Sequence, residues 1–157
     1  MYLWKINKLK ATLASTGLSQ NSCFYYLLIW GVSIVGGMEL MAYYPYETIN
    51  IWRRIITAGY LIVAIVGTYL FYQANGGTNG KDLFDRYMSI GFVVFIRLIP
   101  VMFLLIILLS VFVGVTEGFD ENYMNKAGPA EAFITLFWIS FVWYRMIIHV
   151  KDVANAK

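Results

Sequence analysis

The chain has 157 residues, of which 60% are hydrophobic and only 13% are charged. Soluble globular domains contain about 45–50% apolar and about 25% charged residues, so this composition excludes an ordinary soluble domain. Cys23 is the single cysteine and His149 the single histidine, which excludes an intrachain disulfide and a metal site built from several thiolates or imidazoles. A net charge of +3 is too small to indicate direct nucleic-acid binding. We therefore expect an integral membrane protein without a cofactor, in contact with membrane lipids.

Residues 1–21 precede the first long apolar stretch. Apolar residues recur in this segment at helical spacing, at Leu3, Ile6, Leu9 and Leu13. Lysines stand between them, at Lys5, Lys8 and Lys10. This pattern favours a short amphipathic helix that lies in the membrane interface with its lysines near anionic head groups. The alternative is a frayed polar tail that supplies only orienting charges.

Four apolar stretches are long enough to cross a hydrocarbon core of about 30 Å as helices. We expect these spans at residues 22–43, 55–73, 87–115 and 131–149, followed by a tail at residues 150–157. Residues 74–81 are rich in glycine and asparagine, which favour a tight turn between the second and third spans. Asp82 follows this turn at the expected N-cap of the next helix. The predicted fold class is all-α, with a single four-helix transmembrane domain over residues 1–157.

The distribution of lysine and arginine sets the expected orientation, because these residues concentrate on the cytoplasmic side of membrane proteins. One side of the predicted layout carries Lys5, Lys8, Lys10, Lys81, Arg86, Arg145, Lys151 and Lys157. The other side carries Arg53, Arg54 and Lys126, and Arg97 is left unassigned. We therefore expect both termini and the middle loop in the cytoplasm and an acidic outer loop at residues 116–129. The protein is predicted to be a multi-pass protein of the bacterial inner membrane.

Three residues within the spans are candidates for function, namely Arg97, Glu39 and Pro100. Ionisable groups inside a span are costly and are usually functional. Counting from Tyr87 places Arg97 about 15 Å deep, near the midplane, where it needs a partner or a water-filled path. However, residues 98–115 can cross the bilayer alone, which places Arg97 at the inner interface with its side chain reaching the phosphates. The sequence leaves both interpretations open.

Pro100 removes one backbone hydrogen bond and frees the carbonyl of Ile96. A kink between an interfacial and a crossing part of the third span accounts for it, and a gating hinge is the alternative. Glu39 lies toward the outer end of the first span, where a carboxylate is commonly solvated. The alternative is an ion pair with one of three arginines, Arg53, Arg54 or Arg97. Arg145 and His149 fall near the inner end of the fourth span, as anchors that reach the interface.

Pairs of small residues one helical turn apart predict close approach between helices in lipid. Two such pairs are present, Ser33 with Gly37 and Ser110 with Gly114. They can serve packing within the four-helix bundle or contacts between copies of the chain. A bundle of this size leaves little interior for a substrate cavity of its own, so a transport path would need several copies. We therefore expect a homo-oligomer.

The best cytoplasmic docking surface combines the N-terminal helix with the middle loop, through Lys5, Lys8, Lys10, Lys81, Asp82 and Arg86. No pair of convergent acids, bases or metal ligands is visible in the sequence, so we do not expect an enzyme. The favoured function is a non-enzymatic inner-membrane sensor or anchor that recruits a cytosolic partner. The alternative is a homo-oligomeric ion channel or small transporter subunit with Arg97, Pro100 and Glu39 near the path.

The middle loop carries Gly76-Gly77 and Gly80-Lys81-Asp82, followed by Arg86. With this loop, its size, its four spans and both ends inside, the chain resembles small bacterial inner-membrane proteins. In layout it is similar to the membrane component of the two-gene Kiwa anti-phage system. That resemblance implies an oligomeric envelope sensor paired with a cytosolic DNA-binding effector, and it assigns no role to any individual residue.

Overall fold

The computed structural model describes residues 2, 4–42, 50–117 and 128–156. They form α1 (Ile6–Ser15), α2 (Gln20–Ala42), α3 (Ile51–Ala74), the short 3-10 helix η1 (Gly77–Asn79), α4 (Leu83–Glu117) and α5 (Pro129–Asn155). No strand occurs among these residues. Helices α2, α3, α4 and α5 are each long and apolar enough to cross a membrane. The predicted all-α fold with four candidate spans is therefore confirmed.

Two of the helices extend well beyond the apolar stretches that predicted them. Helix α4 begins at Leu83 and α5 continues to Asn155, because polar residues that flank the apolar stretches continue the helical backbone. The 35 residues of α4 make a helix of about 52 Å. A hydrocarbon core is about 30 Å thick, so part of α4 lies outside it. Most of the predicted acidic outer loop, residues 118–127, lies outside the described residues.

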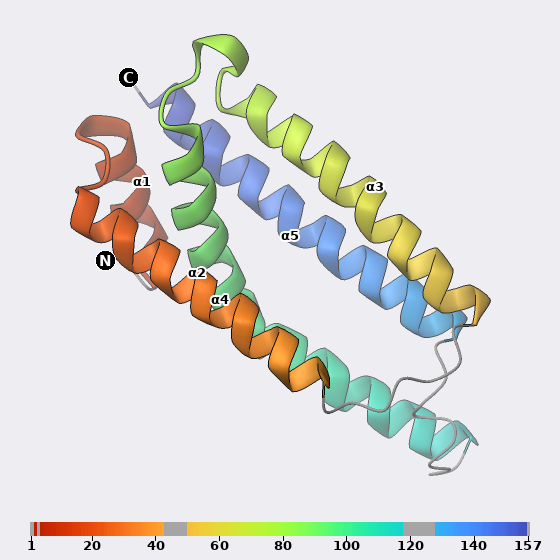
Figure 1. The fold of residues 1–157 in the computed structure, drawn as a ribbon. Helices are drawn as coiled ribbons and strands as arrows, with labels where there is room; N and C mark the ends of the chain where they lie inside the picture. Colours follow the sequence, from red (N-terminus) through yellow and green to blue (C-terminus); the bar gives the residue numbers. More distant parts are fainter. Residues whose placement is uncertain (1, 3, 43–49, 118–127, 157) are drawn as a thin grey trace.

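The two termini and η1 gather at one end of the bundle, which we call the near end (Figure 1). Helices α2 and α4 run from the near end to the opposite, far end, and α3 and α5 run back (Figure 1). The parallel course of α2 and α4 is visible in their ring contacts, where Tyr26 meets Phe92 and Trp30 meets Phe95. Four long helices that alternate in direction bring the two termini to the same end of the bundle.

Two glycines bring α3 directly against α5. A Cβ atom on Gly59 would lie 2.4 Å from Leu136 Cδ2, and one on Gly67 would lie 2.3 Å from Trp143 Cδ2. Both distances are far below van der Waals contact, so a side chain at either position would collide with α5. Lipid tails are as apolar as leucine, and close packing of this kind is what associates helices in a membrane. The α3–α5 pair is thus the most tightly fitted part of the bundle.

The hydrophobic core lies at the near end, where α1 packs against α4 and α5. Helix α1 contributes Ile6, Leu9 and Leu13, and α5 contributes Val150 and Val153, all buried. The segment is helical from Ile6 to Ser15, and Leu3 of the predicted pattern lies outside the described residues. Its apolar face is covered by protein, and its place relative to the membrane interface stays a prediction.

The far halves of α2 and α4 are largely exposed where the structure describes their side chains. Every residue from 31 to 39 in α2 and from 103 to 108 in α4 is exposed. A Cβ atom on Gly37 would meet nothing within 4 Å. Ser33 and Gly37 therefore do not pack against the described part of the chain, and contacts between copies remain as a prediction. Ser110 and Gly114 lie within α4, but what packs against them is outside the described structure.

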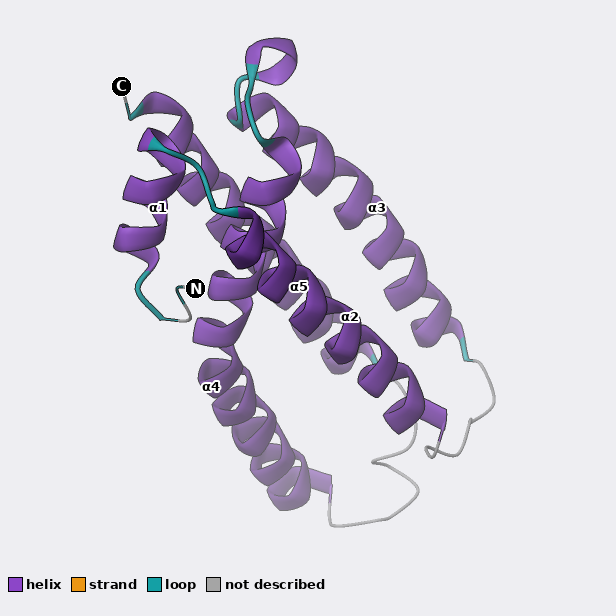
Figure 2. Ribbon diagram, turned by 60° about the vertical axis from the view of Figure 1, so that its left-hand side comes forward, coloured by secondary structure: helices purple, strands orange, loops and turns teal. Residues whose placement is uncertain are grey.

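Helix α4 passes through Pro100 without interruption. In Figure 1 its direction changes between the green first half and the teal second half, and Figure 2 draws α4 in the purple of a helix along its length. A proline inside a helix removes one backbone hydrogen bond and is a common cause of such a bend. The bend agrees with the kink that the sequence predicts, and gating at this position stays a hypothesis.

The Gly67→Ala substitution should destabilise the protein, because the added methyl group meets the rigid ring of Trp143 rather than the end of a flexible side chain. We expect a loss of about 1–3 kcal/mol, as for other overpacked sites, measured as a lower midpoint of thermal unfolding in detergent. Gly37→Ala is the matched control, and alanine there should leave the midpoint unchanged or raise it. Equal midpoints for the two variants would contradict the tight α3–α5 contact.

Candidate functional site

A tight turn joins α3 to α4 at the near end. Gly76 and Gly77 have φ angles of +106° and +57°, which glycine adopts at little cost. A Cβ atom on Gly80 would lie 2.5 Å from the carbonyl oxygen of Asn75, so the chain closes too tightly there for a side chain. The predicted turn is confirmed. Asp82 precedes α4 as expected of an N-cap, but its φ is +51° and its side chain makes no capping hydrogen bond to the described residues.

A buried polar pair fixes this turn to α4. Arg86 is 8% exposed and donates from Nη1 to Asn75 Oδ1 over 2.9 Å. Asn75 is 3% exposed and donates from Nδ2 to the carbonyl oxygen of Lys81 over 3.1 Å. Within the described chain, Arg86 Nε has no hydrogen-bond partner. Arg86, a candidate docking residue by sequence, therefore holds the turn in place from inside the protein.

Polar contacts also fasten the N-terminal segment to the bundle. The hydroxyl of Tyr26, a buried residue of α2, accepts from the Tyr2 amide over 3.0 Å and donates to the Tyr2 carbonyl oxygen over 2.9 Å. Lys10 Nζ lies 2.8 Å from Asp152 Oδ2, which joins α1 to the end of α5. We call residues 2–15, 75–82 and 149–156 together the cap.

The sequence-predicted docking residues divide into two groups. Lys10 and Arg86 have partners within the chain, as described above. Lys5, Lys8, Lys81 and Asp82 are exposed and form no side-chain ion pair within the described structure. The exposed group spreads over α1 and the turn, so the cap presents a charged surface on a fixed support.

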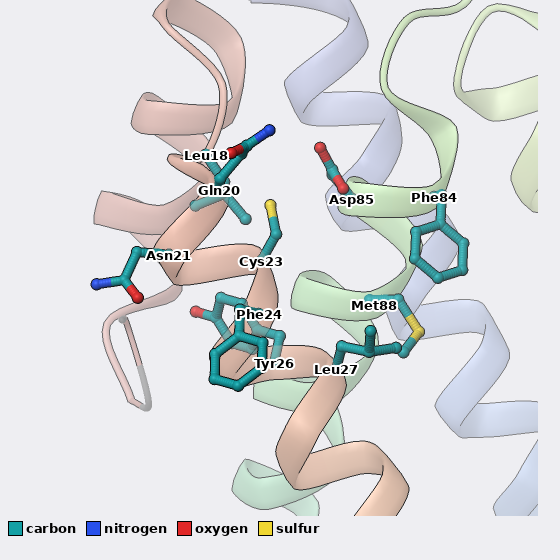
Figure 3. Close-up of a pocket in the computed structure, with 10 residues that line it drawn as sticks. All are labelled: Leu18, Gln20, Asn21, Cys23, Phe24, Tyr26, Leu27, Phe84, Asp85 and Met88. Atoms are coloured by element: carbon teal, nitrogen blue, oxygen red, sulfur yellow. The ribbon is translucent and has the colours of Figure 1, made fainter.

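A groove of about 640 Å³ lies beside the cap, between α2 and α4. Its polar lining comes from Gln20, Asn21, Cys23 and Asp85, and its apolar lining includes Leu27 and Met88. Cys23 and Asp85 lie toward the near end of the groove, and Leu27 and Met88 lie further along it (Figure 3). The sequence does not predict this groove, because its two walls are far apart in the chain and share no motif.

A smaller cavity of about 280 Å³ lies between α4 and α5. It is lined by Arg97, Arg145 and His149 together with Val94, Leu98 and Phe141. The structure thus places Arg97 beside the two residues expected at the inner end of the fourth span. Within the described chain, neither arginine forms an ion pair or a hydrogen bond through its side chain, and His149 Nδ1 has no hydrogen-bond partner.

The remaining intramembrane candidates do not come together. Glu39 is exposed in the far half of α2 and forms no ion pair with any residue that the structure describes. The alternative of an ion pair between Glu39 and an arginine is therefore not found among the described residues, and Arg53 lies instead 3.6 Å from Glu131. Both side chains of that pair are exposed, so it contributes little stability. Pro100 is exposed one turn beyond Arg97.

Comparison with known proteins identifies no relative, because no family model, no curated protein and no solved structure matches the chain. Among the described residues, no group of three or more histidine, cysteine, aspartate or glutamate side chains is placed to hold a metal ion. The cap, the groove and the cavity are thus the candidate functional features of the described structure.

Asn75→Ala should destabilise the near end, because it leaves the buried Arg86 guanidinium without its acceptor. We expect a loss of about 2 kcal/mol in the free energy of unfolding, measured by denaturant titration in mild detergent. The exposed Asn79 in the same turn supplies the control, and Asn79→Ala should change stability by less than about 0.5 kcal/mol. The polar pair would have no structural role if both variants unfolded alike.

Proposed function

We propose that this chain is a non-enzymatic sensor or anchor of the bacterial inner membrane that holds a cytosolic protein on its cap. The observation that carries the proposal is the construction of the cap. Its three segments are fixed by a buried core and by polar contacts, while Lys5, Lys8 and Lys81 stay exposed. A preorganised surface loses little conformational freedom on binding, and its charge favours a partner with an acidic face.

The charge distribution supports a cytoplasmic cap. In the described structure, the near end carries Lys5, Lys8, Lys10, Lys81, Arg86 and Lys151. The far ends of the helices carry Arg53 and Arg54. Since lysine and arginine concentrate on the cytoplasmic side, the near end faces the cytoplasm in this proposal. The groove that contains Cys23 and Asp85 then opens beside the docking surface.

The uncovered far halves of α2 and α4 support assembly of several copies. Ser33 and Gly37 lie one turn apart on the exposed part of α2, where small side chains allow a second helix to approach closely. The layout that resembles the Kiwa membrane component supports the same assembly and a role in anti-phage defence. In that proposal, the cytosolic effector contacts DNA and this chain does not.

A homo-oligomeric channel is the second candidate function. It is favoured by the exposure of Arg97, Pro100 and Glu39 on the helices whose far halves the chain leaves uncovered. In an oligomer built through these helices, the three residues would lie near a shared path. Ion flux through liposomes that falls on Arg97→Ala would favour this candidate over the anchor.

Maleimide labelling tests the proposed orientation. In a Cys23→Ser background, Thr78→Cys places a thiol in the exposed turn and Ala130→Cys places one at the exposed start of α5. We expect a membrane-impermeant maleimide to label Ala130→Cys in intact spheroplasts and Thr78→Cys only after permeabilisation. The opposite pattern would place the cap outside the cell and overturn the proposed cytosolic partner.

Native mass spectrometry of the protein purified from its own host in mild detergent tests the docking function. We expect a homo-oligomer that carries a second, soluble chain. Lys8→Glu should reduce the bound soluble chain at least about tenfold, because like charges across an interface are strongly unfavourable. Arg54→Glu makes the same charge change at the far end and should leave the soluble chain bound. A homo-oligomer without a soluble chain, or equal retention by both variants, would argue against this function.

A further inference from the structure

The cavity between α4 and α5 collects positive charge without a carboxylate to balance it. Arg97 and Arg145 line it from opposite helices, and His149 lines it next to them. Among the residues that the structure describes, no acidic residue lines it. The carboxylate of Asp152 lies 4.0 Å from His149 Nδ1, but it is already engaged with Lys10 at 2.8 Å. Arg97 is exposed and Arg145 is half-buried. Two guanidinium groups that line one cavity repel each other, and an anion between them would offset that repulsion.

From this arrangement we propose that the cavity binds the phosphate group of an anionic phospholipid. Guanidinium groups bind phosphate through two parallel hydrogen bonds, and the arginines from α4 and α5 approach the site from two sides. Basic pockets between transmembrane helices on the cytoplasmic side are suited to lipid head groups. The site shares His149 with the cap, but the exposed Lys5, Lys8 and Lys81 proposed to hold a protein are not part of its lining.

The level of the cavity in the membrane follows from α3, whose 24 residues make a helix of about 36 Å. That length slightly exceeds a hydrocarbon core of about 30 Å, so Ala74 lies close to the near-side boundary. Gly67 lies opposite Trp143 in the parallel pair of α3 and α5. Seven residues further along both helices, Ala74 is level with Val150. Arg145 is then about 7 Å below this level, a distance that its side chain spans to reach the phosphates.

An apolar track leads from the cavity toward the far end, which favours a lipid over a free phosphate ion. Phe141 lines the cavity and stacks on Phe137, which stacks on Phe133, with ring centroids 6.5 and 6.3 Å apart. Phe137 and Phe133 are 61% and 73% exposed. An acyl chain that follows these rings runs into the bilayer while its phosphate stays between the arginines.

The test measures lipid binding to the purified, detergent-solubilised protein by native mass spectrometry. Phosphatidylglycerol and zwitterionic phosphatidylcholine with the same acyl chains are titrated in parallel. We expect phosphatidylglycerol to bind the wild-type protein at least about tenfold more tightly than phosphatidylcholine, since charge-assisted hydrogen bonds to phosphate are retained while the cationic choline group is disfavoured by the arginines. Equal affinities for the two lipids would overturn the proposal, and this comparison needs no variant.

Paired variants localise the site. Arg97→Gln/Arg145→Gln should weaken phosphatidylglycerol binding at least about tenfold, because it removes both charged donors. Arg53→Gln/Arg54→Gln makes the same change in net charge at the far end and should retain wild-type affinity. An equal loss in both variants would show that net charge alone attracts the lipid, which overturns the site.

Inorganic phosphate distinguishes the two sources of the anion. An excess of inorganic phosphate should leave bound phosphatidylglycerol in place, because the acyl chains contribute to binding along the phenylalanine track. Displacement of the lipid by inorganic phosphate would overturn the lipid proposal in favour of a site for a free anion. Retention of the proposed soluble partner is measured in a separate experiment, so either proposal can fail while the other stands.

Discussion

The close approach of α3 and α5 is the contact on which the architecture depends. Lipid supplies no hydrophobic force between helices, so their association rests on fit. Gly67 leaves room for the indole ring of Trp143, and Gly59 does the same for Leu136. This pair runs from one end of the bundle to the other, whereas α2 and α4 are covered by protein mainly at the near end. Helices α3 and α5 are therefore packed against each other along their length. The far halves of α2 and α4 have no such partner within the described chain.

At the near end, α1 supplies what the four long helices lack. Its buried face with Ile6, Leu9 and Leu13 packs against α4 and α5, and the buried Arg86 with Asn75 fixes the following turn. A buried guanidinium is expensive to desolvate, so it is accommodated only where its acceptor is correctly placed. Such a pair restricts the turn to one arrangement. At this end, the buried Arg86 thus stabilises the fold, whereas the exposed lysines form the charged surface.

The sequence predicts what depends on hydropathy and local geometry. The four long helices, the helical spacing of α1 and the glycine turn all follow from patterns within single segments. The faces that meet do not follow, because a leucine that faces lipid and one that faces protein are chemically alike. The close contacts at Gly59 and Gly67 are therefore not predictable from the spacing of small residues, since these glycines stand two turns apart rather than one. In the sequence, Arg86 is a basic residue of the middle loop like Lys81, and only its position beside the end of α3 shows that it is buried. The cavity with Arg97 and Arg145 joins two helices that no spacing rule relates.

The two proposed sites are connected by one row of contacts. His149 lines the arginine cavity, its Nδ1 lies 4.0 Å from Asp152, and Asp152 binds Lys10 of α1 at 2.8 Å. A site in the membrane and a surface in the cytoplasm are coupled only where contacts between them have two arrangements that both sites bias. The Lys10–Asp152 pair suits that role because it is partly exposed and hence inexpensive to rearrange, unlike the buried pair of Asn75 and Arg86. In the proposed sensor, occupancy of the proposed lipid site would reach α1 through the end of α5.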